Sequence, residues 1–149
     1  MNKVKAIIEM PANTNYKYEI DKSTGMMMID RVLDIPTPFN YGYIPETLFD
    51  DGDPLDIFIV SQHPIPSKTL VEVELLGIFT ALDGGQRDDK LVGVLLGEKA
   101  PFHFMHQIKQ YLTLYKKGFE VLQYYEDDYA ALTTIFDAEH SYNKAKNNE

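Results

Sequence analysis

The segment D-D-G-D-P-L-D-I-F-I-V at residues 50–60 joins an acidic turn to an apolar strand. Its first seven residues hold four aspartates, and Gly52 and Pro54 bend the backbone between them. Like charges this close repel one another unless a cation lies between them. Because Asp56 is followed by the apolar run Ile57-Phe58-Ile59-Val60, its carboxylate is tied to a strand, and such a rigid element is what a metal site requires. The segment therefore predicts a carboxylate site at the start of a buried strand, although an ordinary Asp-Gly and Asp-Pro turn fits it equally well.

Short apolar runs bounded by turn residues indicate that β-strands dominate the first two thirds of the chain. We expect strands at residues 4–8, 16–21, 26–32, 55–60, 71–79 and 91–96, and a last one at 119–124. The second and third of these flank the polar turn Lys22-Ser23-Thr24-Gly25, which favours a hairpin. Pro36, Pro38 and Gly42 favour an irregular loop, and residues 83–89 favour a polar one.

Two helices are expected late in the chain. After Pro101, spacings of 3, 4 and 3 make one helical stripe of Met105, Ile108, Leu112 and Tyr115. Asp127 or Asp128 can cap a C-terminal helix whose packed side holds Ala131, Ile135, Ala138 and Tyr142. This order of elements predicts a curved antiparallel sheet or barrel with helices packed on it, in the α+β class and mainly β. No repeat or linker divides the sequence, so we expect a single domain spanning residues 1–149.

The composition excludes several classes of function. The net charge is −9, and a strongly acidic protein repels the phosphates of nucleic acid, so no nucleic-acid partner is expected. Cysteine is absent, which excludes disulfides and thiolate-ligated zinc or iron–sulfur sites. The sequence has no apolar run of about 18 residues and no N-terminal secretory signal. We therefore expect no membrane partner and a cytoplasmic location.

A second acidic loop strengthens the metal-site interpretation. Residues 83–90, D-G-G-Q-R-D-D-K, again place aspartates on a glycine-rich loop ahead of a strand. Oxygen ligands without cysteine favour Mg²⁺ or Mn²⁺ over zinc, and carboxylates from two loops could hold two or more ions. Cationic side chains occur at Lys17, Arg31, Lys90 and Lys116. Phosphoryl transfer needs metals and cationic clamps around a polyanion, so the combination indicates that chemistry, although each cation alone is typical of a solvated surface.

Other metal and phosphate motifs do not fit the sequence. Counted from Asp51, the sixth position of an EF-hand loop is Asp56, where glycine is required. Residues 93–99, G-V-L-L-G-E-K, have three residues between the glycines where a Walker A motif has four, and no Ser or Thr follows the lysine. His103 and His106 could share a helix face, but no H-E-x-x-H pattern surrounds them, so a metal is not expected there.

Taken together, these residues resemble the family I soluble inorganic pyrophosphatases. The segment D-G-D-P-L-D at residues 51–56 resembles that family's signature D-[SG]-D-P-x-D. Further matches keep the family's order and approximate spacing: I-E-M-P at 8–11, K-Y-E at 17–19, D-R at 30–31, N-Y-G-Y at 40–43, D-D-K-L at 88–91 and Y-K at 115–116. The resemblance covers most of the chain. It implies hydrolysis of pyrophosphate to two phosphates by a metal-activated water, on a compact five-stranded OB-type barrel with peripheral helices.

The resemblance also implies metal ligands and a general base. The implied metal ligands are Asp51, Asp56, Asp83, Asp88 and Glu19. Of these, Asp51, Asp56 and Asp88 would hold the tightest ion, and Asp56 would be shared with a second one. Asp83 and Asp88 would hold an ion that arrives with substrate, and Glu19 another. Asp53 would take the proton of the attacking water. Mg²⁺ is the implied cofactor, with Mn²⁺ as a possible substitute.

The same resemblance assigns the remaining site residues to the substrate. The side chains implied to contact phosphate are Lys17, Arg31, Tyr41, Lys90, Tyr115 and Lys116. Glu9 would lie behind the metal ligands. Such donors, with the metals, would stabilise the charge on the leaving phosphate.

Three positions depart from the family pattern. Gly84 stands where an acid is common, Thr37 stands where a tyrosine is common, and the segment between Lys90 and Tyr115 is short. That segment often carries subunit contacts in bacterial members, which are commonly hexamers, so the resemblance implies a homo-oligomer with a hexamer favoured.

Two other functions stay open: a catalytically silent metal- or phosphate-binding module, and a Mg²⁺-dependent phosphatase acting on nucleotides or polyphosphate. Every catalytic position that can be aligned is filled, which favours the enzyme.

Overall fold

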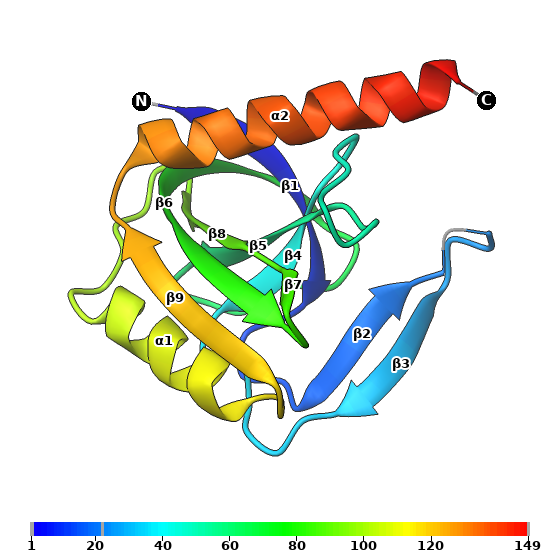
Figure 1. Ribbon diagram of the computed structural model, residues 1–149. Coiled ribbons are helices and arrows are strands. Elements are labelled where there is room, and N and C mark those ends of the chain that lie inside the picture. Colours follow the sequence, from blue (N-terminus) through cyan, green and yellow to red (C-terminus); the bar gives the residue numbers. More distant parts are fainter. Residues whose placement is uncertain (1, 22, 149) are drawn as a thin grey trace.

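A ring of five strands forms the centre of the computed structural model, which describes residues 2–21 and 23–148 (Figure 1). In ring order, the strands are β1 (Lys3–Met10), β4 (Asn40–Ile44), β5 (Leu55–Val60), β8 (Lys90–Leu95) and β6 (Leu70–Asp83). β6 returns to pair with β1 and closes the ring, which confirms the expected five-stranded barrel. The barrel is antiparallel, as the order of elements predicted, except at one place, where β5 and β8 run parallel. An odd number of strands in a closed ring cannot all alternate in direction, so one parallel pair is unavoidable.

The remaining strands extend this ring or stand apart from it. β2 (Tyr16–Ile20) and β3 (Met27–Val32) form a separate two-stranded sheet that projects from the barrel (Figure 1). The predicted hairpin is thus confirmed, while Lys22 of its predicted turn lies outside the described residues. β9 (Phe119–Tyr125) pairs along β6. The polar loop expected at residues 83–89 is shorter than predicted, because β6 continues to Asp83 and pairs with β7 (Gln86–Arg87).

Two apolar clusters lie on opposite faces of the barrel strands. Successive residues of a strand point to opposite faces, so Ile57 and Ile59 of β5 belong to one cluster and Phe58 to the other. The first cluster draws side chains from all five barrel strands and packs against α2 (Asp128–Asn147). The second lies outside the barrel beneath α1 (Phe104–Leu114). Burial on both faces explains why the sequence of β5 is an almost uninterrupted apolar run.

The strand β4 was not expected from the sequence. Pro36, Pro38 and Gly42 predicted an irregular loop, but β4 pairs with β1 on one side and with β5 on the other. The prediction was wrong because Gly42 serves the pairing itself: a Cβ atom there would lie 1.9 Å from the carbonyl oxygen of Ile7. Only glycine lets the two backbones approach so closely at this point.

The two helices lie where the sequence predicted them. On α1, Ile108 and Leu112 are buried as expected, but Met105 is 40% exposed and Tyr111 is buried in its place. Met105 lies in the first turn of the helix, whereas the ring of Tyr111 packs edge-on to Phe58 at 6.1 Å.

The C-terminal helix α2 has the cap and the packed side that its sequence predicted. Its cap is Asp127, whose side chain accepts a hydrogen bond from the backbone amide of Tyr129 at 2.9 Å. Of the predicted packing residues, Ala131, Ile135 and Ala138 are buried, whereas Tyr142 is only partly buried. Neither described helix combines the length and the apolar character needed to cross a bilayer.

Candidate active site

A cleft of about 280 Å³ opens on the outer side of the barrel, beside the β2–β3 hairpin. Its walls come from β2, from β4, from both acidic segments and from the residues that follow α1. Twelve of the thirteen side chains that the sequence singled out line it: Glu9, Lys17, Glu19, Tyr41, Asp51, Asp53, Asp56, Asp83, Asp88, Lys90, Tyr115 and Lys116. Residues 107 positions apart in the sequence, Glu9 and Lys116, are thus brought to one site.

Strand pairing places the centre of this cleft. In the parallel pair β5–β8, Asp56 lies directly beside Lys90. In the antiparallel pair β4–β5, Tyr41 lies opposite Phe58, with the two rings edge to face at 4.9 Å. Residues of equal parity point to the same face of a strand, so Asp56 and Phe58 face outward together. Tyr41, Asp56 and Lys90 thus lie near the starts of three neighbouring barrel strands, and Tyr41 packs against the second apolar cluster.

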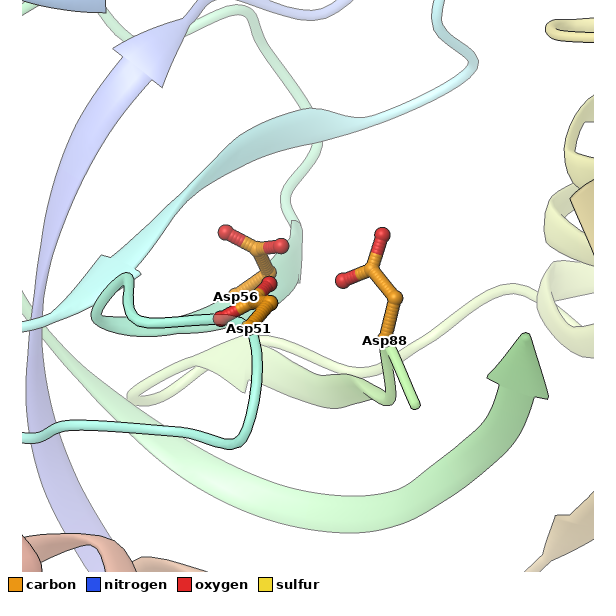
Figure 2. Close-up of side chains that lie close together, drawn as sticks. All are labelled: Asp51, Asp56 and Asp88. Atoms are coloured by element: carbon orange, nitrogen blue, oxygen red, sulfur yellow. The ribbon is translucent and has the colours of Figure 1, made fainter. Parts of the chain in front are cut away.

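Three carboxylates converge in the cleft. One oxygen from each of Asp51, Asp56 and Asp88 lies within 4.8 Å of the other two. In Figure 2, Asp51 and Asp56 lie together on one side, and Asp88 faces them from the other. Hard divalent cations such as Mg²⁺ and Mn²⁺ are bound by such oxygen ligands. The donor set therefore fits a divalent metal ion.

The ammonium group of Lys90 is bound to two of these carboxylates. Its Nζ donates to Asp56 Oδ2 at 2.6 Å, to Asp88 Oδ1 at 2.9 Å and to the Tyr41 hydroxyl at 2.7 Å. Burial alone would lower the pKa of Lys90, but the charge of Asp56 and that of Asp88 raise it well above its ordinary value. Lys90 is therefore charged at neutral pH although its side chain is only 3% exposed.

Crowding and burial make the acids of the cleft harder to ionise. Burial, together with the charges of Asp56 and Asp88, raises the pKa of Asp51 to about 6. Burial likewise raises the pKa of Asp88, and Lys90 offsets only part of that effect. Burial and the charge of Asp56 raise the pKa of Glu9 to about 7. Negative charge accumulated in this way attracts a multivalent cation.

The outer part of the cleft holds a second lysine–carboxylate pair. Lys116 Nζ lies 2.6 Å from Asp83 Oδ2, and both side chains are partly exposed. Asp53 is exposed, and its backbone amide donates to Asp51 Oδ1 at 3.0 Å. Lys17 lies 3.5 Å from Asp30, outside the group of converging carboxylates. Glu19 is exposed on β2, the strand that also carries Lys17.

Arg31 is the one predicted residue that does not line the cleft. It lies within β3, in the strand expected at residues 26–32. Its guanidinium Cζ lies 5.3 Å from the centre of the Tyr115 ring, so it stacks behind a residue of the cleft wall. Its Nε and one terminal nitrogen are buried and have no hydrogen-bond partner among the described residues. Burial raises the pKa of Tyr115 to about 12, so the hydroxyl keeps its proton.

Sequence reasoning missed several side chains of the cleft wall. Tyr43 lines the cleft together with Tyr41. Both lie on β4, where alternate residues share one face, but the prolines and the glycine of this segment predict a loop. Gln86 and Arg87 also line the cleft, from β7. Arg87 Nε donates to Asp89 Oδ1 at 3.1 Å, and its place on the acidic loop was the only signal in the sequence.

Two of the departures from the family pattern have a clear structural setting. Gly84 lies in the turn between β6 and β7 with a φ of +60°, in the left-handed region that favours glycine. Thr37 is fully buried, and its hydroxyl donates to the carbonyl oxygen of Phe39 at 2.8 Å. Both residues therefore suit the local backbone of this chain.

The raised pKa of Glu9 predicts a stabilising substitution. A carboxyl whose pKa is raised to about 7 on folding binds more protons in the folded state, so stability falls as pH rises from about 4.5 to about 7. Glu9→Gln removes this penalty and is expected to stabilise the metal-free protein at pH 8 by about 1–3 kcal/mol, with little effect at pH 4. Thermal unfolding in EDTA at both pH values measures this. Glu139→Gln, an exposed change on α2, is the control. An unchanged or lower Tm for Glu9→Gln at pH 8 contradicts the prediction.

Comparison with known proteins identifies the family of this site. Residues 6–149 match the family model described as inorganic pyrophosphatase. The chain is 36% identical over 129 residues to soluble inorganic pyrophosphatase 2 of Chlamydomonas reinhardtii, an alignment covering 78% of this chain and 67% of that protein. It is 44% identical over 95 residues to the inorganic pyrophosphatase of Campylobacter jejuni, covering 62% and 55% of the two chains. The alignments thus span between about half and two thirds of these relatives.

The fold leads to the same family. The crystal structure of an inorganic pyrophosphatase from Neisseria gonorrhoeae superimposes with a TM-score of 0.87 at 26% identity, covering 95% of this chain and 91% of that one. The match therefore extends over nearly the whole chain. The chain belongs to the inorganic pyrophosphatase family.

Proposed function

We propose that this chain hydrolyses inorganic pyrophosphate to two phosphate ions in the cleft, as a single catalytic domain. The observation that supports this most strongly is the meeting of three converging carboxylates with the ion-paired lysines Lys90 and Lys116 in a cleft that tyrosines also line. A dianionic or more highly charged substrate needs cations on several sides, and the reaction needs an ordered water. Family membership supports the same substrate.

Asp51, Asp56 and Asp88 would hold the first divalent cation, which we propose is Mg²⁺ with Mn²⁺ as a substitute. When bound, such ions supply Lewis-acid chemistry: they lower the pKa of a water and neutralise charge on phosphate oxygens. Asp83 lines the cleft together with Asp88 and would contribute to a further ion, and Glu19 on β2 to another. The oxygen-only donor set supports this assignment.

The remaining side chains would act on the water and on the substrate. Asp53 is exposed in the cleft, so its carboxylate is free to orient a water and to accept its proton. The proposed hydrogen-bond donors to phosphate in the cleft wall are Lys17, Tyr41, Lys90, Tyr115 and Lys116. Arg31, which stacks on the Tyr115 ring, is proposed as a further donor. Glu9 would not bind the cation itself. Its carboxyl interacts electrostatically with Asp56 and would adjust the affinity of the ligands for cations.

A phosphate-release assay tests the proposal. Wild type is expected to release phosphate from pyrophosphate only with Mg²⁺, and Asp53→Asn is expected to lose about 10²–10³-fold in kcat because its amide cannot accept the proton. Asp50→Asn, an exposed neighbour outside the cleft wall, is the matched control. ATP and tripolyphosphate are assayed alongside under the same conditions.

Each alternative function predicts a different result in this assay. Faster release from ATP or tripolyphosphate than from pyrophosphate would move the function to a broader metal-dependent phosphatase. No release from folded protein with either Mg²⁺ or Mn²⁺ would leave a silent binding module. Full activity of Asp53→Asn would remove the general-base role of that residue while keeping the substrate.

We further propose that the chain acts in the cytoplasm as a homo-oligomer, with a hexamer favoured. Large apolar side chains are exposed on and beside α1, β9 and α2: Phe102, Met105, Leu114, Leu122 and Phe136. Exposed apolar groups of this size are typical of surfaces that bind another protein. Sedimentation equilibrium at micromolar protein measures the assembly, and a monomer at all concentrations would contradict it.

A further inference from the structure

Two lysines proposed to bind phosphate are engaged by carboxylates proposed to bind metal. Lys90 contacts Asp56 and Asp88, and Lys116 contacts Asp83. An ammonium group has three N–H donors. Those of Lys90 are matched by three acceptors, the two carboxylates and the Tyr41 hydroxyl, at 2.6–2.9 Å. Lys90 therefore has no donor left for a phosphate oxygen unless it gives up one of these partners.

The same carboxylate oxygens cannot serve both cations fully. A cation held by Asp51, Asp56 and Asp88 would occupy the space that their oxygens enclose, within 4.8 Å. The Lys90 ammonium already lies against two of these three carboxylates. Two positive charges at such short range repel strongly in a buried site, where screening by water is weak. Binding of a divalent cation therefore weakens the ion pairs of Lys90 with Asp56 and Asp88.

We propose that divalent cations and lysines exchange at these carboxylates, so that metal binding releases Lys90 and Lys116 to bind pyrophosphate. This inference rests on the proposed function. Before a cation binds, Lys90 neutralises the buried acids and keeps them together. After it binds, Lys90 turns its donors to the phosphate oxygens in the cleft that it lines. The exchange makes metal binding and pyrophosphate binding cooperative, beyond the general attraction between a cation and an anion.

The two lysine–carboxylate pairs differ in their surroundings. The side chain of Lys90 is 3% exposed, whereas those of Lys116 and Asp83 are 35% and 27% exposed. Solvent weakens an exposed ion pair, so Lys116 is released more easily than Lys90. Removal of Lys90 is therefore expected to change metal affinity more than removal of Lys116.

Lys17 offers a matched control within the same cleft. It lines the cleft and carries the same charge, but its nearest acid is Asp30 at 3.5 Å, which is not among the converging carboxylates. Replacing either lysine by methionine removes one positive charge from the cleft. Only Lys90→Met removes the competitor that contacts Asp56 and Asp88. The difference between the two variants isolates exchange from the general electrostatic effect.

The first measurement is the affinity of metal-stripped protein for Mg²⁺ without substrate, by isothermal titration calorimetry, with Mn²⁺ as a second probe. Lys90→Met is expected to bind the ion at least about fivefold more tightly than Lys17→Met. In EDTA, its Tm is expected to fall relative to wild type, because the buried acids lose their counter-charge. The difference in Tm between Lys90→Met and wild type is expected to become smaller at saturating Mg²⁺. Equal affinities for the two variants, or weaker binding by Lys90→Met, would overturn the exchange.

The second measurement does not depend on Lys90→Met, which would be unsuitable if it failed to fold without metal. It is the affinity of metal-free protein for pyrophosphate, compared between two aspartate variants. Asp83→Asn frees Lys116, so its affinity for pyrophosphate is expected to exceed that of Asp53→Asn by about threefold. Asp53→Asn removes the same charge from the same cleft, but no lysine contacts its carboxylate among the described residues. Equal affinities would overturn the exchange at Lys116.

Failure of this inference is distinguishable from failure of the proposed function. Both titrations are made without turnover, so they report exchange whether or not the protein hydrolyses pyrophosphate. The expected affinity shifts in a protein that releases no phosphate would overturn the hydrolytic proposal alone. Rapid phosphate release together with equal affinities for the paired variants would overturn the exchange alone.

Discussion

Asp56→Asn is expected to lower kcat for pyrophosphate hydrolysis by at least about 10³-fold at saturating substrate and excess Mg²⁺. Asp56 contributes to the three-carboxylate group and also accepts a hydrogen bond from Lys90 at 2.6 Å. The amide keeps the size of the side chain but removes its charge. One substitution therefore weakens the metal ligands and the position of a phosphate donor together.

The control for this prediction lies on the turn that precedes β5. Asp50→Asn makes the same chemical change six residues earlier, at an exposed side chain that does not line the cleft. It is expected to keep activity within about twofold of wild type, as is usual for surface substitutions. Thermal unfolding establishes that both variants are folded. Activity of Asp56→Asn within tenfold of wild type would contradict the role of this carboxylate.

Gly42→Ala is expected to destabilise the fold by at least about 4 kcal/mol, the range reached only by severe packing faults. The new Cβ atom would lie 1.9 Å from the Ile7 carbonyl oxygen and 2.8 Å from its carbonyl carbon. Both are backbone atoms of β1, so no side-chain rotation relieves the clash. The β1–β4 pair would have to separate, and with it the ring. For a chain of this size, the expected loss corresponds to a fall in Tm of about 10 °C or more.

Gly97→Ala separates this clash from ordinary glycine strain. Gly97 has a φ of +90°, and a Cβ atom there would meet no atom of residues 2–21 and 23–148 within 4 Å. Alanine at this position is expected to cost about 1–2 kcal/mol from backbone strain alone. Differential scanning calorimetry of both variants measures the contrast. A Gly42→Ala protein no less stable than Gly97→Ala would show that the two strands can separate cheaply.

Local patterns predicted most of the secondary structure. Alternation and turn chemistry act over a few residues, so the β2–β3 hairpin and the strands β1, β5, β6, β8 and β9 could be found without tertiary information. The missed strand β4 shows where such reasoning fails. The two prolines before it and the glycine within it are typical of a loop. Its strand geometry depends on partners distant in the sequence: Tyr43 pairs with Ile7, 36 residues away, and Gly42 pairs with Ile57, 15 residues away. Pairing with β1 and β5 overrides the local preference.

The sequence by itself determined the class of the fold and the chemical groups of the site. The acids at residues 50–56 and 83–89 indicate a metal site, and their resemblance to a known family assigned roles that stay predictions. Tertiary structure decided how these groups meet. The parallel β5–β8 pair places Asp56 beside Lys90, across 34 residues of chain, and Arg31 lies behind Tyr115 instead of in the cleft wall. Such contacts depend on strand order and on closure of the ring, which no local pattern encodes.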